Sequence, residues 1–255
     1  MSTSSEDAEE ENKELRMLFG LLVIIGYLVL TAVWRLFPGL KADIYDFLII
    51  RMTTKWYAAV LERCAGGDRI IDVGIGTATA LVNNKEILQR KNLVVVGIDP
   101  EAEYIKKAGE VISAAGISER CKVNCASIYD PKLRMLFTGA ARFDAAYFSG
   151  SLTLMPDPAA ALKCAASMLT DKGVIYITQT FQNRPSPIME RLKPLLRRFT
   201  SVDFGKVVYH AEVQSIVAKA GMQVVEDNPV SGSIDNAAQT ARLIVLKPTA
   251  ATKKD

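Results

Sequence analysis

The sequence predicts an α/β protein with a doubly wound sheet of seven strands and one transmembrane helix near its N-terminus. Three observations predict this architecture. Strand-like apolar runs alternate with helix-compatible segments between residues 44 and 248, a glycine turn follows the first run, and an uncharged apolar stretch precedes the series. Alternation of this kind is typical of a parallel sheet with helices on both faces.

The N-terminal region is predicted to be an acidic, disordered tail over residues 1–16. It holds six acidic and two basic residues, a net charge of −4. Because the whole chain has a net charge of +3, the remaining residues carry +7. A basic body of this kind favours contact with anionic surfaces.

The stretch 17–34 contains no charged residue and is almost wholly apolar, which predicts a transmembrane helix. Eighteen helical residues span about 27 Å, close to the thickness of a bilayer's hydrocarbon core. A buried core helix is the alternative, but a helix apolar on all sides is unusual outside a membrane. The acidic leader argues against a cleaved signal or transit peptide.

Basic residues are more numerous after this stretch than before it, so the large domain is predicted to face the cytosol. The chain is expected to be a single-pass protein of the endoplasmic reticulum or another intracellular membrane. The basic residues are Lys13 and Arg16 before the stretch, and Arg35, Lys41, Arg51 and Lys55 after it.

A short linker is predicted over 35–43, the main domain over 44–248 and a flexible tail over 249–255. Apolar spacing over 41–63 is helical. Further helices are expected over 79–90, 101–115, 131–137, 158–169 and 211–220. Strands are expected over 70–73, 93–98, 122–126, 143–149, 174–180, 222–227 and 242–246.

The most informative motif joins the first two strands. The first strand ends in Asp72 and turns through Gly74 and Gly76, and the second ends in Asp99. The first glycine suits a tight turn and the second lets the backbone approach a ligand. An acid at the tip of the second strand is placed to accept hydrogen bonds from two ribose hydroxyls, so the pair indicates a nucleoside site.

The order acid-x-Gly-x-Gly resembles the first motif of the class I S-adenosylmethionine-dependent methyltransferases, which have a Rossmann-like sheet. A nicotinamide site would need glycine where Thr79 stands, and does not usually have an acid at the position of Asp72. The family often has a third glycine where this chain has Ala78. The family's later motifs are similar to residues 142–148, 169–177 and 220–224 of this chain. The sheet of the family ends in an antiparallel strand, and the resemblance implies the same here.

The resemblance implies that S-adenosyl-L-methionine is the cofactor. It places Asp72 near the methionyl amino group, Asp99 on the ribose, and Ser127 and Ile128 near the adenine, where the family often has an acid instead of serine. Ser149 closes the fourth strand near the reacting methyl, although simple turn chemistry explains it equally well. The full predicted cofactor set is Asp72, Gly74, Gly76, Thr77, Asp99, Pro100, Ser127, Ile128 and Ser149.

No catalytic residue stands out, because methyl transfer needs alignment of the reactants more than a protein nucleophile. Weak candidates are Tyr45, Ser149 and His210. Core packing is the competing interpretation for Tyr45. For His210, the only histidine, a place at the start of a helix is the competing interpretation.

The region 184–199 combines an apolar stripe with five basic residues, and Pro194 should kink any helix there. Such a segment suits an anionic membrane surface, and packing of the stripe against the sheet is the alternative. The basic residues are Arg184, Arg191, Lys193, Arg197 and Arg198.

Four cysteines in no paired pattern indicate reduced thiols, and a single histidine argues against a metal site. No nucleic-acid recognition motif is present, and the oligomeric state is not predicted. The leading hypothesis is a membrane-anchored methyltransferase with a small-molecule or lipid acceptor. A protein methyltransferase and a non-catalytic, cofactor-binding membrane scaffold are the alternatives.

Overall fold

The computed structural model describes residues 38–185 and 207–249. The chain divides into two units, Met1–Leu48 and Ile49–Asp255. Apart from the helical residues 38–48, the features below belong to the second unit. The predicted tail over 1–16, the transmembrane stretch 17–34 and the end of the tail over 250–255 lie outside the described residues. Within the described ranges, no helix is both long and apolar enough to cross a membrane.

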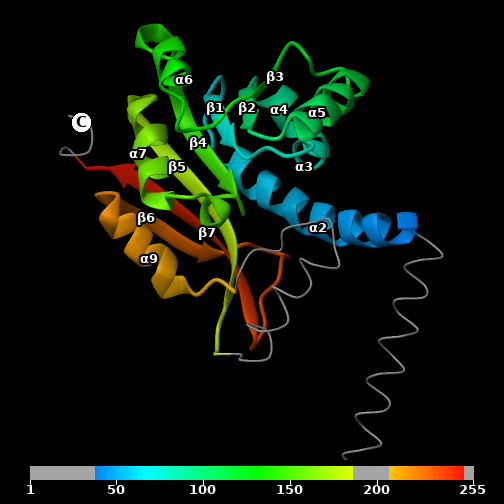
Figure 1. The fold of residues 1–255 in the computed structure, drawn as a ribbon, viewed down its shortest axis with the longest axis vertical. Coiled ribbons are helices and arrows are strands. Elements are labelled where there is room, and N and C mark those ends of the chain that lie inside the picture. The colour runs from blue at the N-terminus through cyan, green and yellow to red at the C-terminus, as the bar shows by residue number, and fades with distance from the viewer. Residues whose placement is uncertain (1–37, 186–206, 250–255) are drawn as a thin grey trace, which may run out of the picture. The chain divides into compact units, whose positions relative to one another are not determined.

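One seven-stranded sheet forms the centre of the unit, in the order β3-β2-β1-β4-β5-β7-β6 (Figure 1). Strands β1 to β5 are parallel, and β7 runs antiparallel to both of its neighbours. This confirms the seven strands and the antiparallel last strand expected from the family resemblance. The strands are β1 Arg69–Val73, β2 Val94–Asp99, β3 Cys121–Cys125, β4 Phe143–Ser149, β5 Leu169–Gln182, β6 Met222–Pro229 and β7 Gln239–Pro248.

Helices cover both faces of the sheet, and most positions of β1, β2 and β4 are therefore buried whichever face they lie on. Buried side chains of α2, α3, α4 and α5 share one core cluster, and those of α6, α7 and α9 share the other (Figure 1). The helices are α2 Pro38–Leu61, α3 Thr79–Val82, α4 Lys85–Arg90, α5 Ala102–Ala114, α6 Pro131–Leu136, α7 Pro158–Ser167 and α9 His210–Lys219; two 3-10 turns are η1 Gly139–Ala141 and η2 Leu152–Leu154.

Two sequence-based expectations about helices need correction. The linker predicted over 35–43 is helical from Pro38 onward, because proline is well tolerated in the first turn of a helix. The single helix predicted over 79–90 is two helices, α3 and α4. The break lies at Asn84, whose side-chain amide donates to the carbonyls of Ala80 and Thr54 at 2.8 and 3.0 Å.

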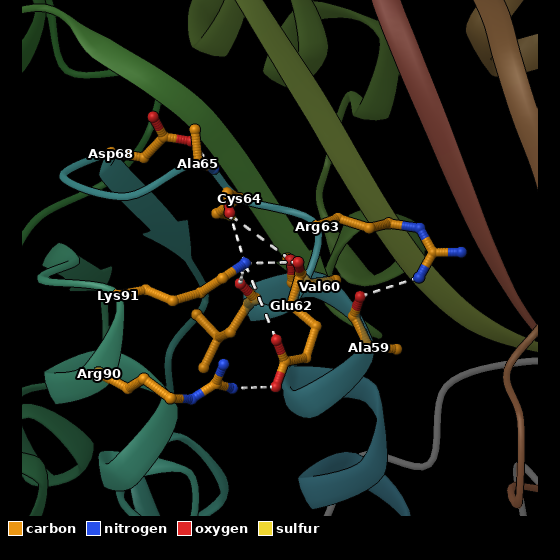
Figure 2. A network of polar contacts seen from close by, with 10 residues as sticks. Ala59, Val60, Glu62, Arg63, Cys64, Ala65, Asp68, Arg90 and Lys91 are labelled. Atoms are coloured by element: carbon orange, nitrogen blue, oxygen red, sulfur yellow. Dashed lines mark hydrogen bonds and ion pairs between the residues drawn. The ribbon is translucent and has the colours of Figure 1, made fainter.

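The carboxyl end of α2 is held by one lysine. The Lys91 ammonium donates to the backbone carbonyls of Leu61 and Cys64 at 3.2 and 2.6 Å, and also to that of Glu62 (Figure 2). The last carbonyls of a helix have no partner within the helix, so a cation placed there satisfies them. Lys91 therefore fixes the end of α2 beside the turn that leads into β1.

We expect Lys91→Met to lower the free energy of unfolding by about 1–3 kcal/mol, because three carbonyls lose a charged donor. Arg90→Met is the matched control, since Arg90 pairs with Glu62 at an exposed site and such pairs contribute about 0–1 kcal/mol. Urea denaturation measures both variants. Equal losses in the two would contradict the capping role of Lys91.

Candidate functional site

A cavity of about 540 Å³ lies at the carboxyl ends of β1, β2 and β4. This is the point where strand order reverses around β1, the usual ligand-binding position in an open α/β sheet. Seven of the nine predicted cofactor residues line the cavity: Gly74, Gly76, Asp99, Pro100, Ser127, Ile128 and Ser149.

The glycine turn after β1 forms the floor of this cavity. Gly74 has a φ of +79°, and a Cβ on it would lie 2.6 Å from the Cβ of Ser151. Gly76 has a φ of +58°, and a Cβ there would meet nothing within 4 Å. The first glycine is thus required by close packing, whereas the second leaves open space beside the backbone for a ligand.

The carboxylate of Asp99 is fixed by the backbone on both of its oxygens. Oδ2 accepts from the Gly76 N–H at 3.1 Å and Oδ1 accepts from the Glu101 N–H at 3.0 Å. The residue is only 7% exposed but lines the cavity. Each carboxylate oxygen can accept more than one hydrogen bond, so Asp99 can still accept from two ligand hydroxyls.

The cavity carries negative charge. Among its described lining residues only Asp99 and Glu101 are charged, and neither lysine nor arginine is present. A cavity of this sign favours a cationic ligand such as a sulfonium and disfavours a pyrophosphate. This agrees with the choice of S-adenosyl-L-methionine over a nicotinamide dinucleotide.

The other two predicted cofactor residues do not line the cavity. Thr77 Oγ1 is hydrogen-bonded to Thr79 Oγ1 at 2.9 Å. Asp72 lies one layer behind the glycine turn, 1% exposed, where its Oδ2 accepts from the Tyr57 hydroxyl at 2.7 Å. Burial raises the pKa of Asp72 to about 7, the Tyr57 hydrogen bond opposes this rise, and the charge of Asp99 adds to it.

Asp72 Oδ1, directly behind the glycine turn, is a buried acceptor with no hydrogen-bond partner among the described residues. Buried acceptors are usually paired, so a positively charged group nearby would be favourable. The open space at Gly76 and the negative charge of the cavity likewise fit a cationic nucleoside. Asp99, Gly74, Gly76 and Ser149 would hold S-adenosyl-L-methionine here.

The weak catalytic candidates are not brought together. His210 does not line the cavity; it begins α9, and its Nε2 lies 2.5 Å from Asp227 Oδ2, a carboxylate that also pairs with Arg242. Tyr45 lies in α2, but its side chain is outside the described part of the chain. Of the predicted basic segment 184–199, everything beyond Pro185 also lies outside it.

An apolar wall of the cavity was missed from the sequence. Tyr104 from α5, Leu154 from η2 and Met155 face the same space as Ser149. Leu154 is 50% exposed although it is a large apolar residue. No spacing signal marks these residues, because they come from three segments that only the fold brings together.

Two glycine variants should separate packing from ligand space. We expect Gly74→Ala to lower the free energy of unfolding by about 2–4 kcal/mol, because its Cβ meets Ser151 and its φ is unfavourable for alanine. Gly76→Ala should cost only about 1–2 kcal/mol, from backbone strain alone. Denaturant unfolding measures the difference, and a larger loss for Gly76→Ala would contradict this account.

The fold is shared with solved structures of low sequence identity. An O-methyltransferase family protein from Burkholderia thailandensis is 16% identical over 81% of this chain and 59% of its own, with a TM-score of 0.60. A geranyl diphosphate C-methyltransferase from Streptomyces coelicolor, in complex with Mg²⁺, geranyl diphosphate and S-adenosyl-L-homocysteine, is 12% identical over 77% and 78%, with a TM-score of 0.58.

A third structure, an S-adenosylmethionine-dependent methyltransferase from Geobacter sulfurreducens in complex with S-adenosyl-L-homocysteine, is 14% identical over 77% of this chain and 90% of its own, with a TM-score of 0.53. No curated protein matches the sequence. A family model described as a methyltransferase domain matches residues 65–226. This match confirms the predicted cofactor, S-adenosyl-L-methionine, at the level of the family, and it shows that the chain belongs to the family of methyltransferase domains.

Proposed function

We propose that the protein is a membrane-anchored, S-adenosylmethionine-dependent methyltransferase that acts on a small-molecule or lipid acceptor. The observation that carries this proposal is the cavity at the strand-order reversal, lined by two carboxylates and no basic side chain among the described residues. Such a cavity fits a cationic nucleoside cofactor. Membership of the methyltransferase domain family supports the same chemistry.

The bound cofactor supplies an activated methyl group on a positively charged sulfur. The protein's task is to align the cofactor with the acceptor and exclude water. Asp99 would hold the ribose end, and Ser149, Leu154 and Met155, which line the same cavity, would border the space left for the acceptor.

The apolar wall of the cavity supports an acceptor that is itself largely apolar. Tyr104, Leu154 and Met155 offer contact surface but no charge. Two of them, Tyr104 and Leu154, are more exposed than large apolar residues usually are. Burial of such surface by an acceptor is favourable by about 25 cal/mol per Å². A metabolite or lipid tail fits this wall better than a charged peptide does.

Membrane attachment rests on the uncharged stretch 17–34 and the basic residues that follow it. If this stretch crosses the bilayer, the methyltransferase domain faces the cytosol, where the cofactor is available. Carbonate extraction of the full chain tests the anchor. The protein should remain in the membrane pellet, and deletion of residues 1–35 should release it; a full chain released by carbonate would contradict the anchor.

Methyl transfer itself is tested with cofactor labelled in its methyl group. The protein is incubated with membrane and soluble extracts, which are then separated into lipids, small metabolites and proteins. Label in lipids or metabolites, absent with Asp99→Ala, is the expected result. Label confined to proteins would favour a protein methyltransferase. Cofactor binding with no transfer to any fraction would favour a non-catalytic scaffold.

A further inference from the structure

Helix α2 delivers a buried tyrosine to the acid of the glycine motif. Tyr57 is 3% exposed, and its hydroxyl donates to Asp72 Oδ2 at 2.7 Å. The matched methyltransferase region begins at residue 65, so this tyrosine lies outside it. Lys91 fixes the end of the same helix, only four residues after Tyr57 (Figure 2). The donor therefore lies close to a helix end whose carbonyls are held by a cation.

The Asp72 carboxylate is poised between its charged and neutral forms. Burial is the largest influence on its pKa and raises it to about 7. The hydrogen bond from Tyr57 favours the ionised form, whereas the negative charge of Asp99 disfavours it. The charge of Asp99, which lines the cavity, therefore affects the pKa of Asp72. Asp72 itself does not line the cavity.

The remaining groups that face Asp72 supply no positive charge. Tyr147 of β4 packs edge-on against Tyr57, with ring centres 4.9 Å apart, and its hydroxyl pairs with Thr178 at 2.8 Å. Burial raises the pKa of the Cys121 thiol in β3 to about 12, and the negative charge of Asp72 also raises it. The thiol is therefore neutral. Among the described residues, Tyr57 is thus the side chain that favours ionised Asp72.

We propose that Tyr57 is a positioning residue for the cofactor site: its hydroxyl holds Asp72 as an oriented carboxylate beneath the glycine turn, and the cationic cofactor binds tightly only while that charge is present. This inference rests on the proposed function, because S-adenosyl-L-methionine carries a sulfonium and an ammonium group. A buried negative charge one layer behind the cavity attracts such a ligand strongly, since little water screens it. Asp72 Oδ1 accepts no hydrogen bond from the described residues.

The test compares Tyr57→Phe with Tyr147→Phe. Both remove one hydroxyl from the same core, but only the first removes a hydrogen bond to Asp72. In the ligand-free protein, the Asp72 carboxyl is titrated by carbon-13 NMR. We expect Tyr57→Phe to raise its pKa by about 1–2 pH units. Tyr147→Phe should leave it nearly unchanged.

Calorimetry with S-adenosyl-L-methionine from pH 6 to 9.5 gives the functional measure. At pH 7, Tyr57→Phe should bind about 5–50-fold more weakly than wild type, the ratio set by the altered fraction of ionised Asp72. By pH 9.5 the two should agree within about twofold. A purely structural role for Tyr57 would instead weaken binding equally at every pH, and that result would overturn the proposal.

A second variant guards against misfolding of Tyr57→Phe. Difluorotyrosine at position 57 keeps the ring and hydroxyl but is a stronger donor, so it should lower the pKa of Asp72 and tighten binding near neutral pH. An unchanged Asp72 titration in both variants would refute the role of Tyr57. Absence of cofactor binding by wild type at any pH would refute the proposed function instead, and the NMR titration would still decide the Tyr57–Asp72 coupling.

Discussion

Asp99→Ala should reduce the affinity for S-adenosyl-L-methionine by about 30–150-fold, equivalent to about 2–3 kcal/mol for the loss of a charged acceptor. The loss has two sources. The ribose hydroxyls lose their acceptor, and the Gly76 and Glu101 N–H groups lose the carboxylate that fixes the turn. Titration calorimetry on the chain lacking residues 1–35 measures the effect.

Glu101→Gln is the matched control for this experiment. Glu101 also lines the cavity and carries charge, but it is exposed, so its screened charge should contribute less than about 1 kcal/mol. Asp99→Asn should be intermediate, because the amide keeps one oxygen acceptor. Wild-type affinity in Asp99→Ala would mean that the cofactor is held elsewhere.

Asp72→Asn should make the ligand-free protein progressively more stable than wild type as the pH rises. The folded-state pKa of Asp72, about 7, lies above its ordinary value of 3.8. Between these values the folded protein retains a proton that the unfolded chain releases, so wild-type stability falls as the pH rises through this window. Asparagine cannot ionise, and the variant avoids this loss.

The advantage of the asparagine variant should increase by about 2–3 kcal/mol between pH 5 and pH 8. The stability difference at any single pH is less informative, because one polar group of the buried asparagine amide also lacks a hydrogen-bond partner, which is destabilising. Glu103→Gln, at an exposed position in α5, should show no comparable pH-dependent gain. Parallel stability curves for Asp72→Asn and wild type would contradict a strongly raised pKa.

Most of the fold could be predicted because its strands are continuous apolar runs with glycine turns at their ends. The strand predicted over 143–149 is β4 as observed, and β1, β2 and β3 differ by a residue at most at either end. Strand β5 is longer than expected, because Leu169–Gly173 joins it across a register shift between Phe143 and Ala145 of β4. The charged pair Asp171-Lys172 hides that extension from an apolar pattern.

The cofactor side of the site could be anticipated because its residues follow strand ends directly. Asp99 and Gly76, both predicted from the motif, lie together in the cavity and are joined by a hydrogen bond. Tyr57 could not be anticipated, since no motif marks it and it occupies a buried position of a helix. Its hydroxyl partner is fifteen residues away on a strand, and only the docked helix brings the two together.

A crystal structure of the chain with S-adenosyl-L-homocysteine is the most direct test of the central claim. The ligand should occupy the cavity at the ends of β1, β2 and β4, with both ribose hydroxyls on Asp99 and the adenine beside Ser127 and Ile128. A ligand bound outside this cavity, or a ribose that does not contact Asp99, would contradict the account.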